Sequence, residues 1–380
     1  MTRSSLFDQY LDPPARAQKA WHAYGLVGNP FPARAHPIWD VLHNQKLVVE
    51  RFYRDLADFC REGNTTTMFF TGGNRVGKTH FCQYHRRVLP QEVRKRDQIL
   101  PVIMLSAQSC DFTELYRELI DQLDDGIRRQ TGAGLFEDQE LLEEQDLSVL
   151  PPGDFHLAVT RLVQARDDRA RQAIRLALRR WLRAERILPG LRRTLGVASV
   201  IESLAHQLNA LEALMKLYCR VMPDQQTPGR PGIVVFLDEF ELIWTHRRDR
   251  RDRFLQAIRA FLDACPKGVF LCVAMTTGLG HEVEDLEGAY PALFARLKGA
   301  RQIPALVEIV GPSEAEEYAN AFLEFATEQA GREGIKPGKP LFTSVDIRKM
   351  FIEVAGGGGT ASQGDFFDQL HTAAERRVSG

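Results

Sequence analysis

The sequence has no stretch of about 18 to 20 uninterrupted apolar residues, the length that a membrane-spanning helix needs. Its N-terminus, MTRSSLFDQYLDPPARAQ, lacks the apolar core of a signal peptide. The six cysteines include no CxxC pair, and no histidine spacing typical of a zinc site accompanies them. We therefore expect a cytoplasmic protein with reduced core cysteines, no membrane contact and no zinc.

An excess of charge of one sign is also missing. The 49 Lys and Arg residues are balanced by 50 Asp and Glu residues, which leaves a formal net charge of -1. Attraction to nucleic acid would then have to come from local patches rather than from the overall charge. With 44% hydrophobic and 26% charged residues, the 380-residue chain has the composition of a globular protein.

Short apolar runs predict strands, because each is rich in β-branched or aromatic residues and shows little polar alternation. These runs cover residues 67–71, 100–107, 233–239, 269–277 and 306–310. Helical patterns lie between several of them, at 79–89, 112–129 and 253–265. Alternating strands and helices favour a parallel sheet with helices on both faces.

The spacing of these runs also predicts the domain organisation. The interval 112–222 is too long for a simple crossover and contains helical patterns, so we expect a helical insert there. Helical patterns dominate again after residue 312. We therefore expect a lead-in segment over 1–60, an α/β domain over 61–311, and a helical domain over 312–380.

Residues 72–79 read GGNRVGKT and match the phosphate-loop pattern G-x-x-x-x-G-K-[ST]. The motif follows an apolar run and opens a helical pattern, so backbone N–H groups and a helix N-terminus would converge on a polyphosphate. We expect Lys78 to reach the β and γ phosphates and the Thr79 hydroxyl to bind Mg²⁺. A glycine turn without a ligand is the alternative. The predicted nucleotide-binding residues are Gly72, Gly73, Asn74, Arg75, Val76, Gly77, Lys78, Thr79 and His80.

The apolar run 233–239 ends in Asp238 and Glu239. A buried strand that ends in two acids can direct both carboxylates toward a nucleotide. We expect Asp238 to hold Mg²⁺, directly or through water, and Glu239 to orient or deprotonate the attacking water.

Together, GGNRVGKT, IVVFLDE and the helical C-terminal region resemble an AAA+ ATPase over about residues 60–380. The segment WHAYGLVGNPFP resembles the lead-in of the branch that holds the origin-recognition initiators and the TnsC-type transposition regulators. GKTHF, FLDEFE and YPALFARL also look like the ATP-binding proteins of BREX-type phage defence. The fold implied is a three-layer P-loop NTPase with a helical insert and a C-terminal helical lid.

The AAA+ resemblance implies further site residues. Thr276 or Thr277 matches the sensor 1 position, where a polar side chain contacts the γ phosphate or water; we favour Thr277. Arg296 matches the arginine finger that acts on a neighbouring subunit, with Arg301 as its alternative and an ordinary solvated helix arginine as the other interpretation. No arginine follows Gly356–Gly359 as sensor 2 would require, and the possible substitutes are Arg348, Arg376 and Arg377.

The function implied is that of an ATPase that uses ATP and Mg²⁺, assembles into a homo-oligomer on ATP, and drives or regulates a DNA-associated assembly in replication, transposition or phage defence. Other proteins of the same system are possible partners. The alternative is a signalling or scaffold NTPase whose nucleotide state switches a protein partner without nucleic acid. A third interpretation is a clamp that binds ATP but hardly turns it over.

The interval 161–193 holds eleven arginines, no lysine and only three acids. Arg171, Arg175 and Arg179 recur every four residues beside an apolar stripe, so they predict one basic helix face. Such a face can bind nucleic-acid phosphates through release of counterions. Alternatively, these arginines pair with the acidic stretch at 137–146 or with a neighbouring subunit.

Overall fold

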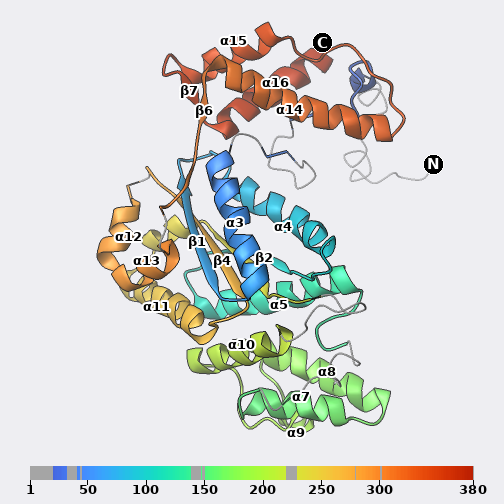
Figure 1. Cartoon of the computed structure of the whole chain (residues 1–380), viewed down its shortest axis with the longest axis vertical. Coiled ribbons are helices and arrows are strands. Elements are labelled where there is room, and N and C mark those ends of the chain that lie inside the picture. Colours follow the sequence, from blue (N-terminus) through green and yellow to red (C-terminus); the bar gives the residue numbers. More distant parts are fainter. Residues whose placement is uncertain are drawn as a thin grey trace, which may run out of the picture. The chain divides into compact units, whose positions relative to one another are not determined.

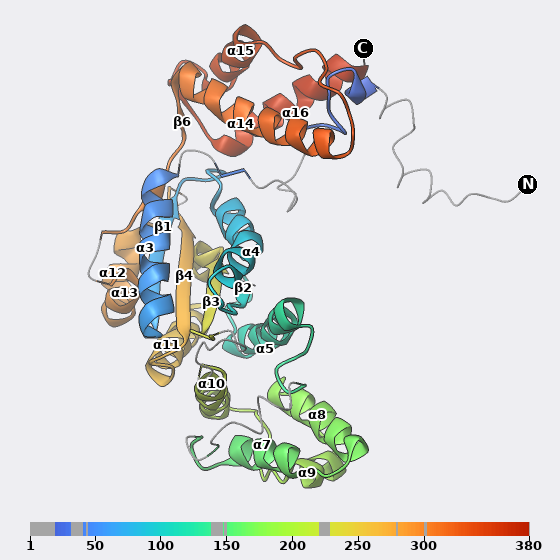
Figure 2. The same ribbon diagram turned by 45° about the vertical axis from the view of Figure 1, so that its right-hand side comes forward.

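The computed structural model describes residues 20–31, 41–42, 45–137, 147, 150–219, 229–278, 280–299 and 302–379. The chain divides into two compact units. The first contains residues 1–46, 72–84 and 306–380, and the second contains residues 47–71 and 85–305. Figures 1 and 2 show the same ribbon from two directions. Among the described helices, none combines the length and the apolar composition that crossing a bilayer requires.

A five-stranded sheet forms the centre of the second unit, with the strand order β2-β3-β4-β1-β5. The pairs β2–β3 and β3–β4 are parallel, and Ser106 at the end of β2 is in register with Asp238 at the end of β3. Strands β3 and β4 are buried along their whole length. This explains their continuous apolar sequence, since helices cover both faces of the sheet. The strands are β1 (Thr66–Gly72), β2 (Val102–Ser106), β3 (Ile233–Asp238), β4 (Val269–Thr276) and β5 (Ala305–Leu306).

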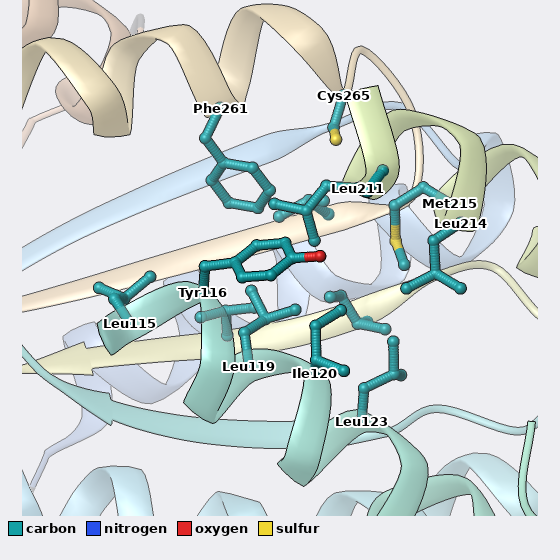
Figure 3. Packing of buried hydrophobic residues seen from close by; sticks show 14 of the residues in the cluster. Leu115, Tyr116, Leu119, Ile120, Leu123, Leu211, Leu214, Met215, Phe261 and Cys265 are labelled. Atoms are coloured by element: carbon teal, nitrogen blue, oxygen red, sulfur yellow. The ribbon is translucent and has the colours of Figure 1, made fainter. Parts of the chain in front are cut away.

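Alternating side chains of the strands meet different helices. On one face, Phe52 of α3 (Lys46–Glu62) stacks on Phe236 and Phe270 at 5.7 and 5.6 Å between ring centroids. On the other face, Val235 and Leu271 belong to a core shared with α5 (Phe112–Thr131), α10 (Leu204–Tyr218) and α11 (Arg248–Ala264). Figure 3 shows the side chains of α5 against those of α10 and α11. The sheet is therefore the middle of three layers.

The remaining helices of the second unit extend this core. The interval predicted as a helical insert contains α5 and α10 together with α7 (Asp154–Gln164), α8 (Asp168–Leu182) and α9 (Pro189–Leu195). After β3 the chain forms a 3₁₀ helix, η2 (Phe240–Thr245), and then α11. After β4 it forms α12 (Val283–Ala289) and α13 (Pro291–Lys298).

The first unit has its own helical core. It is built by α14 (Gly311–Arg332), α15 (Ser344–Ala355) and α16 (Gln363–Ser379), together with the lead-in segment. Phe31 is fully buried against Phe322, Phe342 and Phe367, with ring centroids 5.7 to 6.2 Å apart. The Asn29 side chain donates to the His371 carbonyl at 3.2 Å, so the described part of the lead-in segment is bound to the last helix.

The prediction of a single strand at 306–310 is wrong. Two short strands lie there instead: β5 joins the large sheet, and β6 (Ile309–Val310) pairs antiparallel with β7 (Thr360–Ala361). The Gln45 side chain binds both backbone groups of Val307, accepting from its N–H at 3.2 Å and donating to its carbonyl at 3.3 Å. Because a side chain satisfies these groups, the strand pairing is interrupted at Val307.

Candidate active site

The phosphate-loop motif has the predicted local structure. Strand β1 ends at Gly72, the loop follows, and α4 (Lys78–Arg94) begins at the motif lysine. Two loop positions have left-handed backbone, Arg75 at φ 61° and Gly77 at φ 100°. A Cβ atom at Gly72 would lie 2.6 Å from the Val76 side chain. Glycine is therefore required at position 72 by contact and favoured at position 77 by conformation.

Lys78 is folded back over this loop. Its side chain is 8% exposed, and Nζ donates to the carbonyls of Gly72 at 3.0 Å and Gly73 at 2.6 Å. Thr79 is exposed at the first turn of α4. The His80 ring contacts the Val41 carbonyl at 2.7 Å through Nε2, so this predicted site residue also binds the lead-in segment. A lysine held at the mouth of such a loop can neutralise phosphate charge.

The carboxyl ends of β2 and β3 gather polar groups in the second unit. Asp238 is 4% exposed, and its carboxylate accepts from the Glu239 N–H at 2.9 Å. Glu239 is exposed and has left-handed backbone at φ 57° and ψ 35°. The Ser106 hydroxyl donates to the Glu239 carboxylate at 2.6 Å. Such strain in a residue other than glycine is typical of functional positions.

The end of β4 is fixed by a second acid. The Glu241 carboxylate accepts from the Thr276 N–H at 2.9 Å and from the Thr276 hydroxyl. Thr276 is buried, whereas Thr277 follows directly after the strand and is partly exposed. Of the two sensor 1 candidates, Thr276 is thus already engaged by a protein carboxylate.

Arg296 lies on α13 with its side chain 54% exposed and paired with Asp263 of α11. Its backbone carbonyl accepts from the Thr67 hydroxyl at 2.6 Å, which connects α13 to β1. Arg301, the alternative finger, lies outside the described residues. Of the possible sensor 2 substitutes, Arg348 pairs with Glu316 at 2.8 Å and Arg377 with Asp346 at 2.8 Å.

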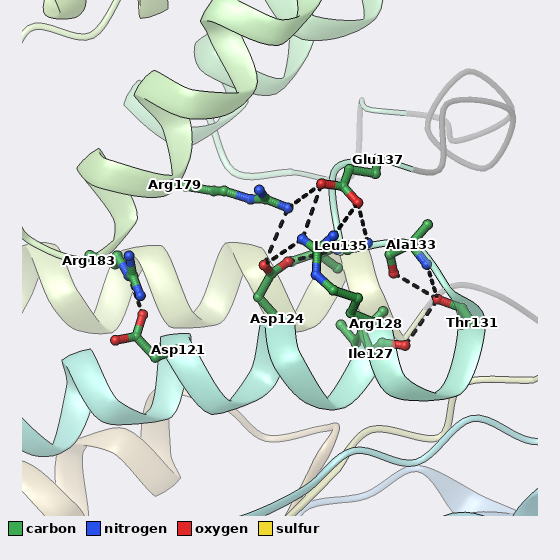
Figure 4. A network of polar contacts seen from close by, with 11 residues as sticks. Asp121, Asp124, Ile127, Arg128, Thr131, Ala133, Leu135, Glu137, Arg179 and Arg183 are labelled. Atoms are coloured by element: carbon green, nitrogen blue, oxygen red, sulfur yellow. Dashed lines mark hydrogen bonds and ion pairs between the residues drawn. The ribbon is translucent and has the colours of Figure 1, made fainter. Parts of the chain in front are cut away.

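The three arginines predicted to bind nucleic acid lie on α8 and are engaged within the protein. Arg179 binds Glu137 at 2.7 Å and Asp124 at 3.3 Å, and Arg128 of α5 binds the same two acids (Figure 4). Arg175 is 3.5 Å from the Glu137 carbonyl, and Arg171 donates to the Ala165 carbonyl at 2.8 Å. Arg179 thus pairs with Glu137, the first residue of the acidic stretch, as the alternative interpretation expects. Residues 138–146 of that stretch lie outside the described residues.

This four-residue network of Asp124, Arg128, Glu137 and Arg179 perturbs the Glu137 carboxyl. Burial favours its neutral form, but hydrogen bonds from the Gly134 N–H, Arg128 and Arg179 outweigh burial and lower its pKa to about 2. The network therefore joins α8 to α5 by charge-assisted hydrogen bonds, which are stronger than neutral ones.

The sequence analysis missed Ser106 and Glu241. Ser106 contacts Glu239 from a position far away in the sequence. Glu241 contacts Thr276 and belongs to the acidic motif FLDEFE, which also contains the two predicted acids. The only available signal was that Ser106 ends an apolar run, as Asp238 does.

The donors present fit Mg²⁺. Among the described residues, no group of three or more His, Cys, Asp or Glu side chains is placed to hold a metal ion. Mg²⁺ is usually bound by one or two protein oxygens together with substrate phosphates and water. The Thr79 hydroxyl in the first unit and the Asp238 carboxylate in the second are each an oxygen donor of this kind. All six cysteines are free thiols, and burial raises the pKa of Cys265 to about 12.

Comparisons with known proteins found one family model and solved structures that are similar to this chain. Residues 138–304, which include Asp238, Glu239 and Arg296, match the family model described as BREX system ATP-binding protein BrxC/D. Two solved structures from Aeropyrum pernix are similar. The ORC1 protein, solved in complex with DNA, has a TM-score of 0.43 and 14% identity over 89% of this chain. The ORC2 protein, solved as ADPNP-ADP complexes, has a TM-score of 0.40 and 12% identity over 87% of this chain.

The chain spans 61% of the ORC1 chain and 68% of the ORC2 chain. No curated protein matches it. The predicted fold class is confirmed: this is an α/β P-loop NTPase-like fold with helical regions and a five-stranded sheet that is parallel in the pairs β2–β3 and β3–β4. The resemblance to the BREX system ATP-binding proteins BrxC/D is confirmed over residues 138–304.

Proposed function

We propose that this protein binds ATP with Mg²⁺ at the loop 72–79 and hydrolyses it. The observation that carries the proposal is the strand–loop–helix unit itself, with Lys78 buried and bound to the carbonyls of Gly72 and Gly73. Incoming phosphates would replace these carbonyls as the partners of Lys78. The exposed amides of the loop would donate to the phosphate oxygens, as in other phosphate loops.

The proposed catalytic roles are assigned to residues at and near the ends of the strands. Thr79 and Asp238 are the residues proposed to hold Mg²⁺, which would supply charge neutralisation to the β and γ phosphates when bound. Glu239 would accept the proton of the attacking water, and the Ser106 hydroxyl would hold its carboxylate in place beforehand. With Thr276 held by Glu241, Thr277 is the residue proposed to contact the γ phosphate or the water.

Arg296 is proposed to complete the site of a neighbouring subunit. Its half-exposed side chain pairs only with Asp263 among the described residues, so a modest rearrangement would release it. An arginine of this kind stabilises the charge that develops on the transferred phosphoryl group. This role requires assembly on ATP, which mass measurement of the particle with ATP, with ADP and with DNA would test.

The ATPase proposal is tested by phosphate release from the wild type, Lys78→Ala, Glu239→Gln and Ser106→Ala. We expect Glu239→Gln to lower kcat by roughly 100-fold or more while retaining ATP binding, and Lys78→Ala to weaken binding itself. Ser106→Ala should lower kcat with little change in KM. Equal background rates in all four proteins would refute hydrolysis and leave the clamp interpretation.

A DNA-associated role is the finer part of the proposal. It is supported by the arginine-rich interval 161–193 and by the similarity to BREX system proteins. Arg169 and Arg180 of α8 are exposed, and their side chains have no hydrogen-bond or ion-pair partner in the described part of the chain. These two arginines are better placed for phosphate contacts than Arg171, Arg175 and Arg179, which already bind protein groups.

A protein-switching NTPase is the second candidate function. The specific observation in its favour is that Arg179 serves to join α8 to α5 rather than being available to a polyanion. Binding of a labelled duplex at two salt concentrations separates the two functions. Steep salt dependence that is lost in Arg169→Glu/Arg180→Glu supports DNA, whereas no binding even at low salt supports the protein partner.

A further inference from the structure

The first turn of α16 lies directly against the phosphate loop, within the first compact unit. The Gly364 N–H donates to the Arg75 carbonyl at 2.9 Å, and the Arg75 guanidinium donates to the Gly364 carbonyl at 3.2 Å. One loop residue thus binds both backbone groups of one helix residue. The loop and the start of the last helix are joined at Arg75.

Two carboxylates of α16 complete this contact. Arg75 pairs with Asp365 at 3.0 Å and with Asp368. The two acids are three residues apart, so they lie on one face of the helix. We call Arg75, Gly364, Asp365 and Asp368 the loop clasp.

The packing at the loop clasp leaves no room for larger groups. A Cβ atom at Gly364 would lie 2.8 Å from Arg75 Nε and 2.9 Å from Arg75 Cβ. A Cβ atom at Gly77 would lie 3.0 Å from the side-chain oxygen of Gln363, which is itself buried. The helix therefore fits the loop through glycines on both sides.

The charges of the loop clasp bear directly on phosphate binding. Asp365 and Asp368 are about half exposed, and without Arg75 they would place two negative charges beside a loop that must accept a polyanion. Negative charges that lie close together repel each other, and solvent weakens this repulsion without removing it. Arg75 offsets both carboxylates.

We propose that Arg75 is a positioning residue that ties the phosphate loop to α16 and shields the nucleotide from Asp365 and Asp368. The proposal rests on the proposed ATP site at residues 72–79. It connects the C-terminal helices to the nucleotide through a loop arginine and the carboxylates of α16, in a chain where the segment directly after Gly356–Gly359, TASQGDFFDQL, contains no arginine.

The test is the affinity for a fluorescent ATP analogue in a set of charge variants. Arg75→Ala should weaken binding by about tenfold, because the two carboxylates are then unopposed. Arg75→Ala/Asp365→Asn/Asp368→Asn should return the affinity to within about threefold of the wild type. Asp365→Asn/Asp368→Asn alone should bind at least as tightly as the wild type. If Arg75 merely shaped the loop, neutralising the acids would rescue nothing, and that result would overturn the proposal.

Glu316→Gln is the matched control. It neutralises another lid carboxylate paired with an arginine, Arg348, and should leave the affinity for the ATP analogue unchanged within about twofold. An effect equal to that of the loop clasp variants would show that any loss of lid charge changes binding, and would overturn the proposal.

Hydrogen exchange without nucleotide separates this proposal from the ATP site. The amides of residues 362–368 should exchange faster in Arg75→Ala than in the wild type, by about tenfold, because the tie to the loop is lost. Equal exchange in the two proteins would overturn the loop clasp even if ATP binds. A wild type that binds no ATP analogue would instead refute the proposed function, while the exchange still decides whether Arg75 ties loop and helix.

Discussion

Arg179 and Arg180 are neighbours on α8, yet they have opposite environments. Arg179 is 30% exposed and binds Glu137 and Asp124. Arg180 is exposed and has no ionic partner among the described residues. The same contrast holds between Arg171 and Arg175, whose side chains bind carbonyls, and Arg169, which is exposed and without an ionic partner in the described ranges.

Regular spacing of the arginines therefore identifies a helix face, but it does not determine what that face contacts. A four-residue repeat places Arg171, Arg175 and Arg179 together, and this face lies beside the apolar stripe that packs on the core. Arginines near a packed stripe extend along it and reach acids of the neighbouring element. On α8, the arginines outside the repeat, Arg169 and Arg180, are the ones available to a partner.

The largest expected effect comes from reversing the charge of Arg179. Arg179→Glu should lower the free energy of unfolding by about 3 kcal/mol, because it places three acids together in a half-buried network. Arg180→Glu, one residue later, should change it by less than about 0.5 kcal/mol. Urea denaturation of both variants measures the difference. Equal stability of the two would contradict the distinction drawn here.

For binding to a DNA duplex, the exposed arginines should matter more than the engaged ones, which is the reverse of their order for stability. Arg169→Glu/Arg180→Glu should weaken binding to a labelled duplex by about tenfold at low salt and reduce the slope of log K against log salt by about 2. The matched control is Arg171→Gln, which removes a charge from the face that is engaged within the protein, and should have a smaller effect. Unchanged binding in this double variant would show that Arg169 and Arg180 do not contact DNA.

The pH dependence of stability sharpens the same comparison. Because the pKa of Glu137 is lowered from 4.5 to about 2, its contribution is fully present above about pH 4.5 and is lost as the pH falls toward 2. Glu137→Gln should therefore be less stable than the wild type by about 1 kcal/mol at about pH 6, and this difference should shrink toward zero at about pH 2.5. A gap that does not depend on pH would mean that the network contributes by packing rather than by charge.

The smallest effect is expected at Glu185, an exposed acid 3.8 Å from Arg183. Glu185→Ala should change the free energy of unfolding by less than about 0.5 kcal/mol in the same urea assay, since exposed ion pairs contribute little. A loss as large as that of Glu137→Gln would show that exposure does not separate the two classes of ion pair in this protein.

Much of the fold could be predicted from local sequence. The buried strands β3 and β4 are nearly continuous apolar runs, and helices α14 to α16 follow regular patterns, so burial and periodicity were sufficient. The split of residues 306–310 was not predictable, because it depends on the Gln45 side chain, which is 262 positions away in the sequence. Tertiary contacts of this kind leave no local pattern.

The site was predictable where a motif has a fixed spacing and not where partners come from distant elements. GGNRVGKT gives the loop, and the acids after an apolar run give Asp238 and Glu239. By contrast, Ser106 contacts Glu239 across 133 positions, and Arg75 contacts Asp368 across 293. These contacts depend on which strand ends and which helix the fold brings together.

The left-handed backbone of Glu239 has a consequence for how the thermal stability of this chain can be increased. Glycine or asparagine would adopt φ 57° more readily, whereas glutamate there sacrifices on the order of 1 kcal/mol. Selection for thermal tolerance alone would therefore tend to replace this residue and remove the carboxylate that Ser106 holds. Retention of glutamate at position 239 in heat-adapted variants would indicate that turnover, and not only folding, is under selection.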